Sequence, residues 1–538
     1  MTDQTGHSSP SRFDPEEIRG TIVRRLKSHF AFAALLAILF LTFLDNTVAS
    51  AVLTSVQSEL HSNVSQLQWV VGGYALAFAS LMLMFGALGD NFGRKKIMLI
   101  GVGIFCVGSI VCAIAVNPSE LVIGRIVMGV GAAASEPGTL SMIRHIFPDR
   151  RARARALGAW AAVCGLALAM GPVAGGILVG IWSWRAVFWF NLLFGGLALV
   201  VAAIALPESV NPVRRRVDLA GFLLAAVVLG TATFATIQGE LTGYVTGWVI
   251  TLYVVSAATI PIFYFAERRA KDPMLELGFF RRRSFTGSAF IAFASFFSVF
   301  SIFFFVALYL EVVVAVSAYG LARDFLPLLG GIVVSALFTG RWVGRVGSRI
   351  PMTVGCLLAA LGVLLTEHVI GPHVDLLTLG WTMGLAGIGF GILIVPVNAT
   401  ALSSLPAANS GMASSAVNTA RELGAVAGVA ILGSIVNGQL TVNLTQRLIQ
   451  LHVPAFYRNQ IITAVTTGTA GSQAAALSHH STKYIRHLIN EVVNAAYGAL
   501  THGLDIALIA SCILLLAAAL VAYYTGTADR LELVDIEE

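Results

Sequence analysis

Residues 86–96 read G-A-L-G-D-N-F-G-R-K-K and separate two long apolar stretches of the chain. Glycines such as Gly86 and Gly93 carry no side chain, so neighbouring helices can approach closely and the chain can turn tightly. Asp90 can accept hydrogen bonds near a helix terminus or pair with Arg94. We therefore expect this loop to latch two membrane helices together.

The composition on either side of this loop indicates a membrane protein. Of the 538 residues, 57% are hydrophobic and 12% are charged, about half the charged fraction of an average soluble chain. Because so few charges cannot cover a water-facing surface, lipid must be the main solvent. The net charge of +6 does not indicate a nucleic-acid partner, because the cations lie in short clusters between apolar runs, as they do in membrane proteins.

Fourteen stretches are long and apolar enough to be membrane helices, since a bilayer core requires about 20 apolar residues per helix. The first is too long for the core of a signal peptide and has no small-residue cleavage site after it, so we expect it to stay as a helix. The fourteen stretches cover residues 31–53, 66–87, 97–116, 121–143, 156–179, 186–206, 218–238, 246–266, 285–312, 325–343, 351–370, 375–397, 412–437 and 502–524.

The basic residues predict the orientation of these helices. With the N-terminus inside, the clusters at residues 94–96, 214–216 and 281–283 all fall in cytoplasmic segments, as the positive-inside rule requires. We therefore expect a multi-pass protein of the inner membrane with both termini in the cytoplasm.

The cysteines and histidines predict neither a metal site nor a disulfide. All five cysteines lie inside apolar runs without C-x-x-C spacing, so we expect small buried hydrophobic side chains. The histidine cluster at residues 479–487 has no cysteine or carboxylate at ligand spacing. No Walker-type phosphate loop is present. We therefore expect no cofactor and no ATP-driven transport.

The loop at residues 86–96 resembles the signature loop of the major facilitator superfamily, with Asn91 in place of a basic residue. Three further stretches resemble motifs of its drug:proton antiporters. L-D-N-T-V-A-S-A-V-L-T at residues 44–54 is similar to the first-helix motif, and G-R-I-V-M-G-V-G-A-A-A at residues 124–134 to the fourth-helix motif. A-M-G-P-V-A-G-G at residues 169–176 is similar to the fifth-helix motif.

Two more stretches, W-S-W-R-A-V-F-W-F-N at residues 182–191 and N-T-A-R-E-L-G-A-V-A-G-V-A at residues 418–430, resemble the fourteen-helix branch of this superfamily. The resemblance implies an all-α membrane protein of two six-helix bundles with two inserted helices. Gly340, Gly344 and Gly347 faintly repeat the signature loop in the second half, as expected for two parallel repeats. The resemblance also implies structural roles for Gly171, Pro172, Gly175, Gly176 and Arg421.

The implied division of the chain has five parts. Residues 438–500 carry apolar side chains at helical spacing between polar ones, which predicts two or three amphipathic helices outside the membrane. They would form either a packed cap or an element for gating or partner docking. The five parts are residues 1–30 (cytoplasmic tail), 31–206 (first bundle), 207–284 (inserted helices and linkers), 285–524 (second bundle with the extracytoplasmic insertion 438–500) and 525–538 (cytoplasmic tail).

Ionisable residues inside the predicted helices are candidates for function, because a charge at the bilayer centre costs about 2.5–3.5 kcal/mol. Asp45 is expected to be a proton-coupling or cation-binding carboxylate, with a structural hydrogen bond as the alternative. The resemblance makes Arg125 a proton-relay residue, and the alternative is a lattice of hydrogen bonds to neighbouring helices.

Two further carboxylates are candidates in the fourth and thirteenth predicted helices. Glu136 precedes Pro137, and the small neighbours leave space for a carboxylate that faces a central cavity and binds substrate or a proton. The alternative is an ion pair with a cytoplasmic-side cation such as Arg144. Glu422 is the second candidate for coupling, next to Arg421, which we expect near the inner mouth.

These residues together predict a transporter rather than an enzyme, since no nucleophile–base pair or metal cluster lies at membrane depth. The expected function is proton-coupled export of small hydrophobic or cationic compounds by alternating access. The expected partners are a small-molecule substrate, protons and the lipid bilayer, and the expected state is a monomer. An exporter of a lipid, a siderophore or a self-made antibiotic on the same fold is the main alternative, and a passive channel is another.

Overall fold

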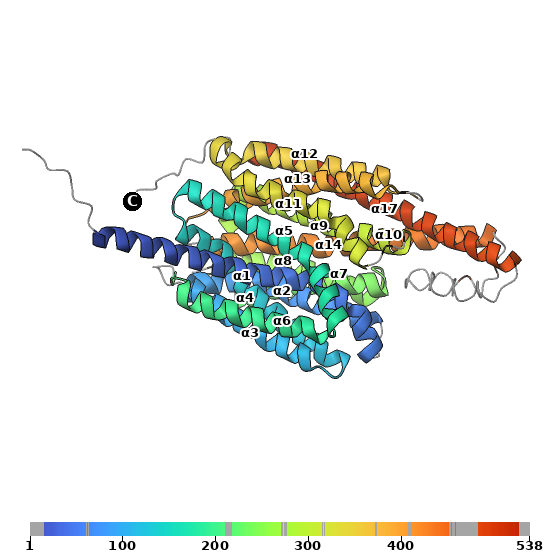
Figure 1. Ribbon diagram of the computed structural model, residues 1–538, viewed down its shortest axis with the longest axis horizontal. Helices are drawn as coiled ribbons and strands as arrows, with labels where there is room; N and C mark the ends of the chain where they lie inside the picture. The colour runs from blue at the N-terminus through green and yellow to red at the C-terminus, as the bar shows by residue number, and fades with distance from the viewer. Residues whose placement is uncertain are drawn as a thin grey trace, which may run out of the picture.

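The computed structural model describes residues 15–526 except 61, 63, 210–217, 271, 272, 274–276, 315, 317, 372, 373, 407–409 and most of 451–482. Within these residues the chain is helical and contains no strand. The helices run side by side along the longest axis of the molecule (Figure 1). We call the end at which α1 begins the N-terminal face and the other end the opposite face.

The first six helices form one bundle that is held by close backbone approaches. A Cβ atom on Gly101 or Gly108 of α3 would lie within 3 Å of backbone atoms of α4, so these helices touch without intervening side chains. Asn117 and Asp149 cap the starts of α4 and α5 with their side chains. The six helices are α1 (Pro15–Leu60), α2 (Val64–Phe92), α3 (Arg94–Ile114), α4 (Pro118–Ile146), α5 (Arg150–Ile181) and α6 (Arg185–Ala205).

The next two helices, α7 (Leu219–Thr242) and α8 (Gly247–Arg269), lie between the two halves of the chain. α7 packs against α2 of the first half and α14 of the second, whereas α8 packs mainly on α7. α8 carries many exposed apolar side chains, as expected for a helix whose outer surface contacts lipid.

The remaining helices form the second bundle. Its first span is continuous through α9, a short π-helical segment and α10, and the π-helical segment holds Ile302–Val306. The second bundle packs on the first through α14 against α2 and α11 against α5. Its elements are η1 (Leu277–Arg281), α9 (Arg283–Ser301), η2 (Ile302–Val306), α10 (Ala307–Val312), α11 (Ala318–Val346), α12 (Arg349–Val369), α13 (Leu376–Ser403), α14 (Ser410–Gln450) and α17 (Lys483–Thr525).

The turn after the second helix of each bundle contains a glycine with a positive φ. Gly93 between α2 and α3 has φ 109°, and Gly347 between α11 and α12 has φ 81°. Side chains other than glycine rarely adopt such values. The faint sequence repeat around Gly347 therefore corresponds to a repeated structural feature.

The number of membrane spans in the described residues is close to the predicted fourteen. Twelve helices are long and apolar enough to cross a membrane, and α5 adds a thirteenth if its two parts, bent by 42°, count as one span. The bend lies around Gly171 and Pro172, where proline removes a helical hydrogen bond. This count covers the described residues only, and α14 is not part of it. Fourteen spans therefore stay a prediction.

The structure changes the ends of the predicted insertion at residues 438–500. α14 continues as one helix to Gln450, and α17 begins at Lys483, so these two parts continue the membrane helices instead of forming separate amphipathic ones. Both helices project beyond the other helices at the opposite face (Figure 1). Most of residues 451–482 lie outside the described residues, so the rest of the predicted insertion is still a prediction.

Candidate functional site

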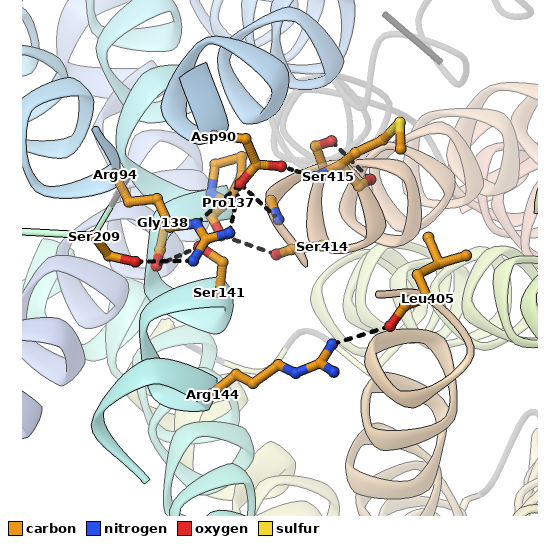
Figure 2. A network of polar contacts seen from close by, with 12 residues as sticks. Asp90, Arg94, Pro137, Gly138, Ser141, Arg144, Ser209, Leu405, Ser414 and Ser415 are labelled. Carbon is orange, nitrogen blue, oxygen red and sulfur yellow. Dashed lines mark hydrogen bonds and ion pairs between the residues drawn. The ribbon is translucent and has the colours of Figure 1, made fainter. Parts of the chain in front are cut away.

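Asp90, at the end of α2, connects the two bundles at the N-terminal face. Its carboxylate accepts hydrogen bonds from the backbone N–H groups of Gly411 (3.1 Å) and Met412 (3.0 Å) at the start of α14 (Figure 2). It also pairs with Arg94 at 2.7 Å. A negative charge at a helix N-terminus is stabilised by the helix dipole. Asp90 therefore has both of the contacts that the sequence predicted.

The glycines of the signature loop allow this contact. A Cβ atom on Gly86 would lie 2.4 Å from the Ser415 side chain, so α2 and α14 could not approach as they do with a larger residue. The side chain of Arg94 reaches the Ser209 hydroxyl at 3.0 Å after α6 (Figure 2). The loop thus joins three segments of the chain.

Arg144 makes a second connection between the bundles at the same face. Its guanidinium donates to the backbone carbonyls of Leu402 (2.6 Å) and Leu405 (3.2 Å) at the end of α13. A cation at a helix C-terminus is stabilised by the helix dipole. Arg144 thus binds the end of α13 and Asp90 the start of α14 (Figure 2). The predicted alternative of an ion pair between Glu136 and a cation such as Arg144 is therefore met by a different cation, Arg421.

Asp45 and Arg125 form an ion pair inside the first bundle. The Arg125 Nη1 and Asp45 Oδ2 atoms are 2.5 Å apart, and both side chains are almost completely buried. Asn191 of α6 donates to the other Asp45 oxygen at 2.7 Å. Arg125 also donates to the Val70 carbonyl at 2.9 Å and lies 4.6 Å from the centre of the Tyr74 ring. Both charges therefore have several partners.

Glu136 pairs with Arg421, which lies on the other bundle. The distance between Glu136 Oε1 and Arg421 Nη2 is 2.9 Å, and the exposed fractions of the two residues are 0% and 2%. The Arg421 guanidinium also donates to the side-chain oxygen of Asn418, one turn earlier in α14. Arg421 lies about three turns into α14, so it is deeper in the bundle than the predicted inner mouth.

Three aromatic rings surround the Arg421 guanidinium. Its Cζ atom is 5.0 Å from the ring centre of Phe296, 5.1 Å from Trp160 and 5.7 Å from Phe43. These distances are within the range of cation–π attraction. The Trp160 indole N–H donates to the Thr139 hydroxyl at 3.1 Å, which fixes the ring. The pair with Glu136 is thus enclosed by α1, α4, α5, α9 and α14.

Glu422 lies next to this pair. Its side chain is 3% exposed, and its charge interacts with those of Glu136 and Arg421. Asn46 of α1 is its side-chain hydrogen-bond partner. The structure thus brings Glu136, Arg421 and Glu422 into one cluster, which we call the interface cluster. Asp45 and Arg125 form a separate pair.

The glycines of the fifth-helix motif differ in their surroundings. A Cβ atom on Gly171 would lie 1.9 Å from the Thr47 hydroxyl oxygen, so this glycine lets α5 contact α1. Gly175 is buried, whereas a Cβ atom on Gly176 would have no neighbouring atom within 4 Å. Pro172 lies within α5 at the bend, and its side chain is outside the described ones.

Three of the residues that position these charges were not identified from the sequence. Asn191 and Asn418 are buried amides that bind Asp45 and Arg421, and Trp160 is a wall of the interface cluster. The two asparagines could have been identified from the sequence, because a lone amide in an apolar helix requires a hydrogen-bonding partner. Trp160 could not, because tryptophan is common in membrane helices.

Comparison with known proteins agrees with this arrangement. The Major Facilitator Superfamily profile matches residues 35–429. The chain is 30% identical to the multidrug resistance protein Stp of Mycobacterium tuberculosis over 84% of this chain and 83% of Stp. It is 31% identical to the methylenomycin A resistance protein of Bacillus subtilis, over 73% of this chain and 84% of that protein.

A solved structure has the same fold. The human organic anion transporter MFSD10 (TETRAN) superposes with a TM-score of 0.56 at 15% identity, over 91% of this chain and 99% of that one. The predicted all-α major facilitator fold is therefore confirmed. This chain belongs to the Major Facilitator Superfamily, and its relatives are multidrug and antibiotic resistance transporters.

Proposed function

We propose that this protein is a proton-coupled antiporter that exports small hydrophobic or cationic compounds across the inner membrane by alternating access. The observation that carries the proposal is the ion pair between Glu136 and Arg421, because it is buried and joins one bundle to the other. The relatives support a drug as cargo, since Stp is named for multidrug resistance at 30% identity.

The charge balance of the interface cluster supports proton coupling. The cluster holds two carboxylates, Glu136 and Glu422, and one guanidinium, Arg421, so it has one carboxylate in excess. An uncompensated buried charge is costly. The cluster is therefore best satisfied by one proton or one cationic cargo, and the two compete. A proton that crosses 100 mV supplies about 2.3 kcal/mol for this exchange.

Asp45 and Arg125 form the second ionisable pair of the proposal. Their charges already balance, and Asn191 and Val70 supply further hydrogen bonds. We infer that this pair holds α1 and α4 in the correct relative position while the interface cluster exchanges the proton. A direct coupling role for Asp45 stays a prediction.

The connections at the N-terminal face supply the gate that alternating access requires. With the predicted orientation, this face is cytoplasmic, and Asp90 and Arg144 close it by binding the start of α14 and the end of α13. Cargo from the cytoplasm enters when these contacts separate. The methylenomycin A resistance protein is named for an antibiotic, which favours an antibiotic over a lipid or a siderophore among the alternative cargoes.

Reconstituted vesicles test the proposal. Purified protein in liposomes loaded with ethidium should release the dye faster when a pH gradient is imposed than when a proton ionophore has collapsed it. Glu136→Gln should abolish the effect of the gradient, and Glu367→Gln, at a half-buried position of α12, should keep it. Dye release that is the same with and without the gradient would contradict proton coupling.

A further inference from the structure

The interface cluster leaves several buried hydrogen-bonding atoms without a partner. Arg421 Nε and Nη1, the Asn418 amide nitrogen and Glu136 Oε2 are all shielded from solvent and make no hydrogen bond. A buried polar atom without a partner costs about 1–3 kcal/mol. Four such atoms close together would destabilise the protein, so a role in structural support alone does not explain them.

These unsatisfied atoms are mostly donors. The Nε atom of Arg421 carries one N–H, whereas its Nη1 atom and the Asn418 amide nitrogen carry two each. Glu136 Oε2 is the acceptor among them. Arg421 and Glu136 compensate each other in charge at 2.9 Å. The Glu136–Arg421 pair is thus balanced in charge, and the unsatisfied atoms at it are mainly hydrogen-bond donors.

The surroundings of these donors are aromatic and come from both bundles. Phe43 and Trp160 belong to the first bundle and Phe296 to the second, all with ring centres within 5.7 Å of the Arg421 Cζ atom. Flat apolar surfaces beside a guanidinium favour a flat ring system, because such rings stack on both.

From this combination we infer that the interface cluster is a binding site for flat aromatic compounds that carry carbonyl oxygens. The carbonyl oxygens accept hydrogen bonds from Arg421 and Asn418, and the ring system lies against Trp160 and Phe296. The ligand enters when the bundles separate, since the same groups contact each other directly when the bundles are together. This inference rests on the proposed export function and specifies one class of its cargo.

A matched pair of probes isolates the hydrogen bonds. 9,10-Anthraquinone and anthracene have the same three fused rings and differ by two carbonyl oxygens. We expect the purified protein in detergent to bind anthraquinone at least about tenfold more tightly than anthracene, the effect of one to two net hydrogen bonds. Saturable quenching of tryptophan emission, corrected with protein-free micelles, measures both affinities. Equal affinities in the wild-type protein would overturn the inference without any variant.

Two variants of the protein and a cationic probe test whether Arg421 and Asn418 cause the preference for anthraquinone. Arg421→Lys keeps the charge but removes the planar donors, and Asn418→Asp replaces a donor with an acceptor at constant volume. Each should reduce the preference for anthraquinone to about twofold. Asn418→Asp should leave the affinity for ethidium, a flat cation without carbonyl groups, unchanged or tighter. An equal loss of affinity for anthraquinone, anthracene and ethidium would indicate that these residues have only a structural role and would contradict the assignment. Arg323→Lys, at an exposed position, is the matched control.

A failure of this ligand assignment can be distinguished from a failure of the proposed antiporter function. Proton-driven ethidium release with no preference for anthraquinone would reject the ligand class and keep the antiporter. A preference for anthraquinone that depends on Arg421, without proton-driven release of any probe, would reject the coupling and keep the site.

Discussion

Glu136 of α4 and Arg421 of α14 form a buried ion pair across the interface of the two bundles, with 2.9 Å between Oε1 and Nη2. The two residues are 285 positions apart in the chain. Because each bundle contributes one charge, separation of the bundles must break the pair. The pair therefore connects the state of one side chain to the relative position of the bundles.

The Glu136–Arg421 pair should show strong energetic coupling. Arg421→Gln leaves the buried Glu136 charge uncompensated, so we expect a loss of about 3–5 kcal/mol in the free energy of unfolding. The double variant Glu136→Gln/Arg421→Gln removes both charges and should recover most of this loss. Denaturation of the purified protein in detergent measures both values. If the two single effects simply add in the double variant, the pair has no such coupling.

The connections at the N-terminal face should control how often that face is closed. Each helix-dipole contact of Asp90 and Arg144 contributes about 1 kcal/mol, so Asp90→Asn/Arg144→Gln should shift the equilibrium about thirtyfold toward the open state. Spin labels at the exposed residues Phe92 and Ile350, in a cysteine-free background, report the distance between the bundles there. Arg345→Gln, an exposed change in α11, should leave the distance distribution unchanged. An unaltered distribution in the double variant would show that these contacts do not close the face.

The glycines of the fifth-helix motif should differ sharply in their tolerance of alanine. Gly171→Ala would place a Cβ atom 1.9 Å from the Thr47 hydroxyl oxygen, so we expect it to destabilise the protein by about 1–3 kcal/mol. Gly176→Ala, with open space around it, should have little effect. Thermal unfolding in detergent compares the two, and equal melting temperatures would mean that α1 and α5 do not depend on this close contact.

The opposite face should lose stability in acid through Glu59. Arg185 donates a hydrogen bond to this carboxylate and, with one from Trp184, lowers the pKa of Glu59 below its ordinary value of 4.5. A lowered pKa in the folded state stabilises the protein above pH about 4.5, and this contribution disappears as the pH falls through the folded value. The melting temperature of the wild-type protein should therefore fall more between pH 5 and about 3 than that of Glu59→Gln. Parallel curves for the two proteins would contradict this contribution.

The sequence predicted the helices well and the contacts between them only in part. Apolar runs of about 20 residues determine membrane spans, and the contacts of Asp90 followed from a local pattern of glycines and charges. The partner of Glu136 did not follow, because it lies 285 positions away and depends on how the two bundles pack. Arg144 was the nearest cation in the same helix, but it binds the end of α13 instead.

Proton release on cargo binding tests the central claim most directly. The claim is that a proton and a cationic cargo compete for the carboxylate in excess at the interface cluster. Addition of ethidium to the purified protein in weakly buffered detergent should release about one proton per bound dye from the wild-type protein. Glu422→Gln removes the carboxylate in excess, so ethidium should release almost none from it. The same proton release from Glu422→Gln as from the wild-type protein would contradict the claim.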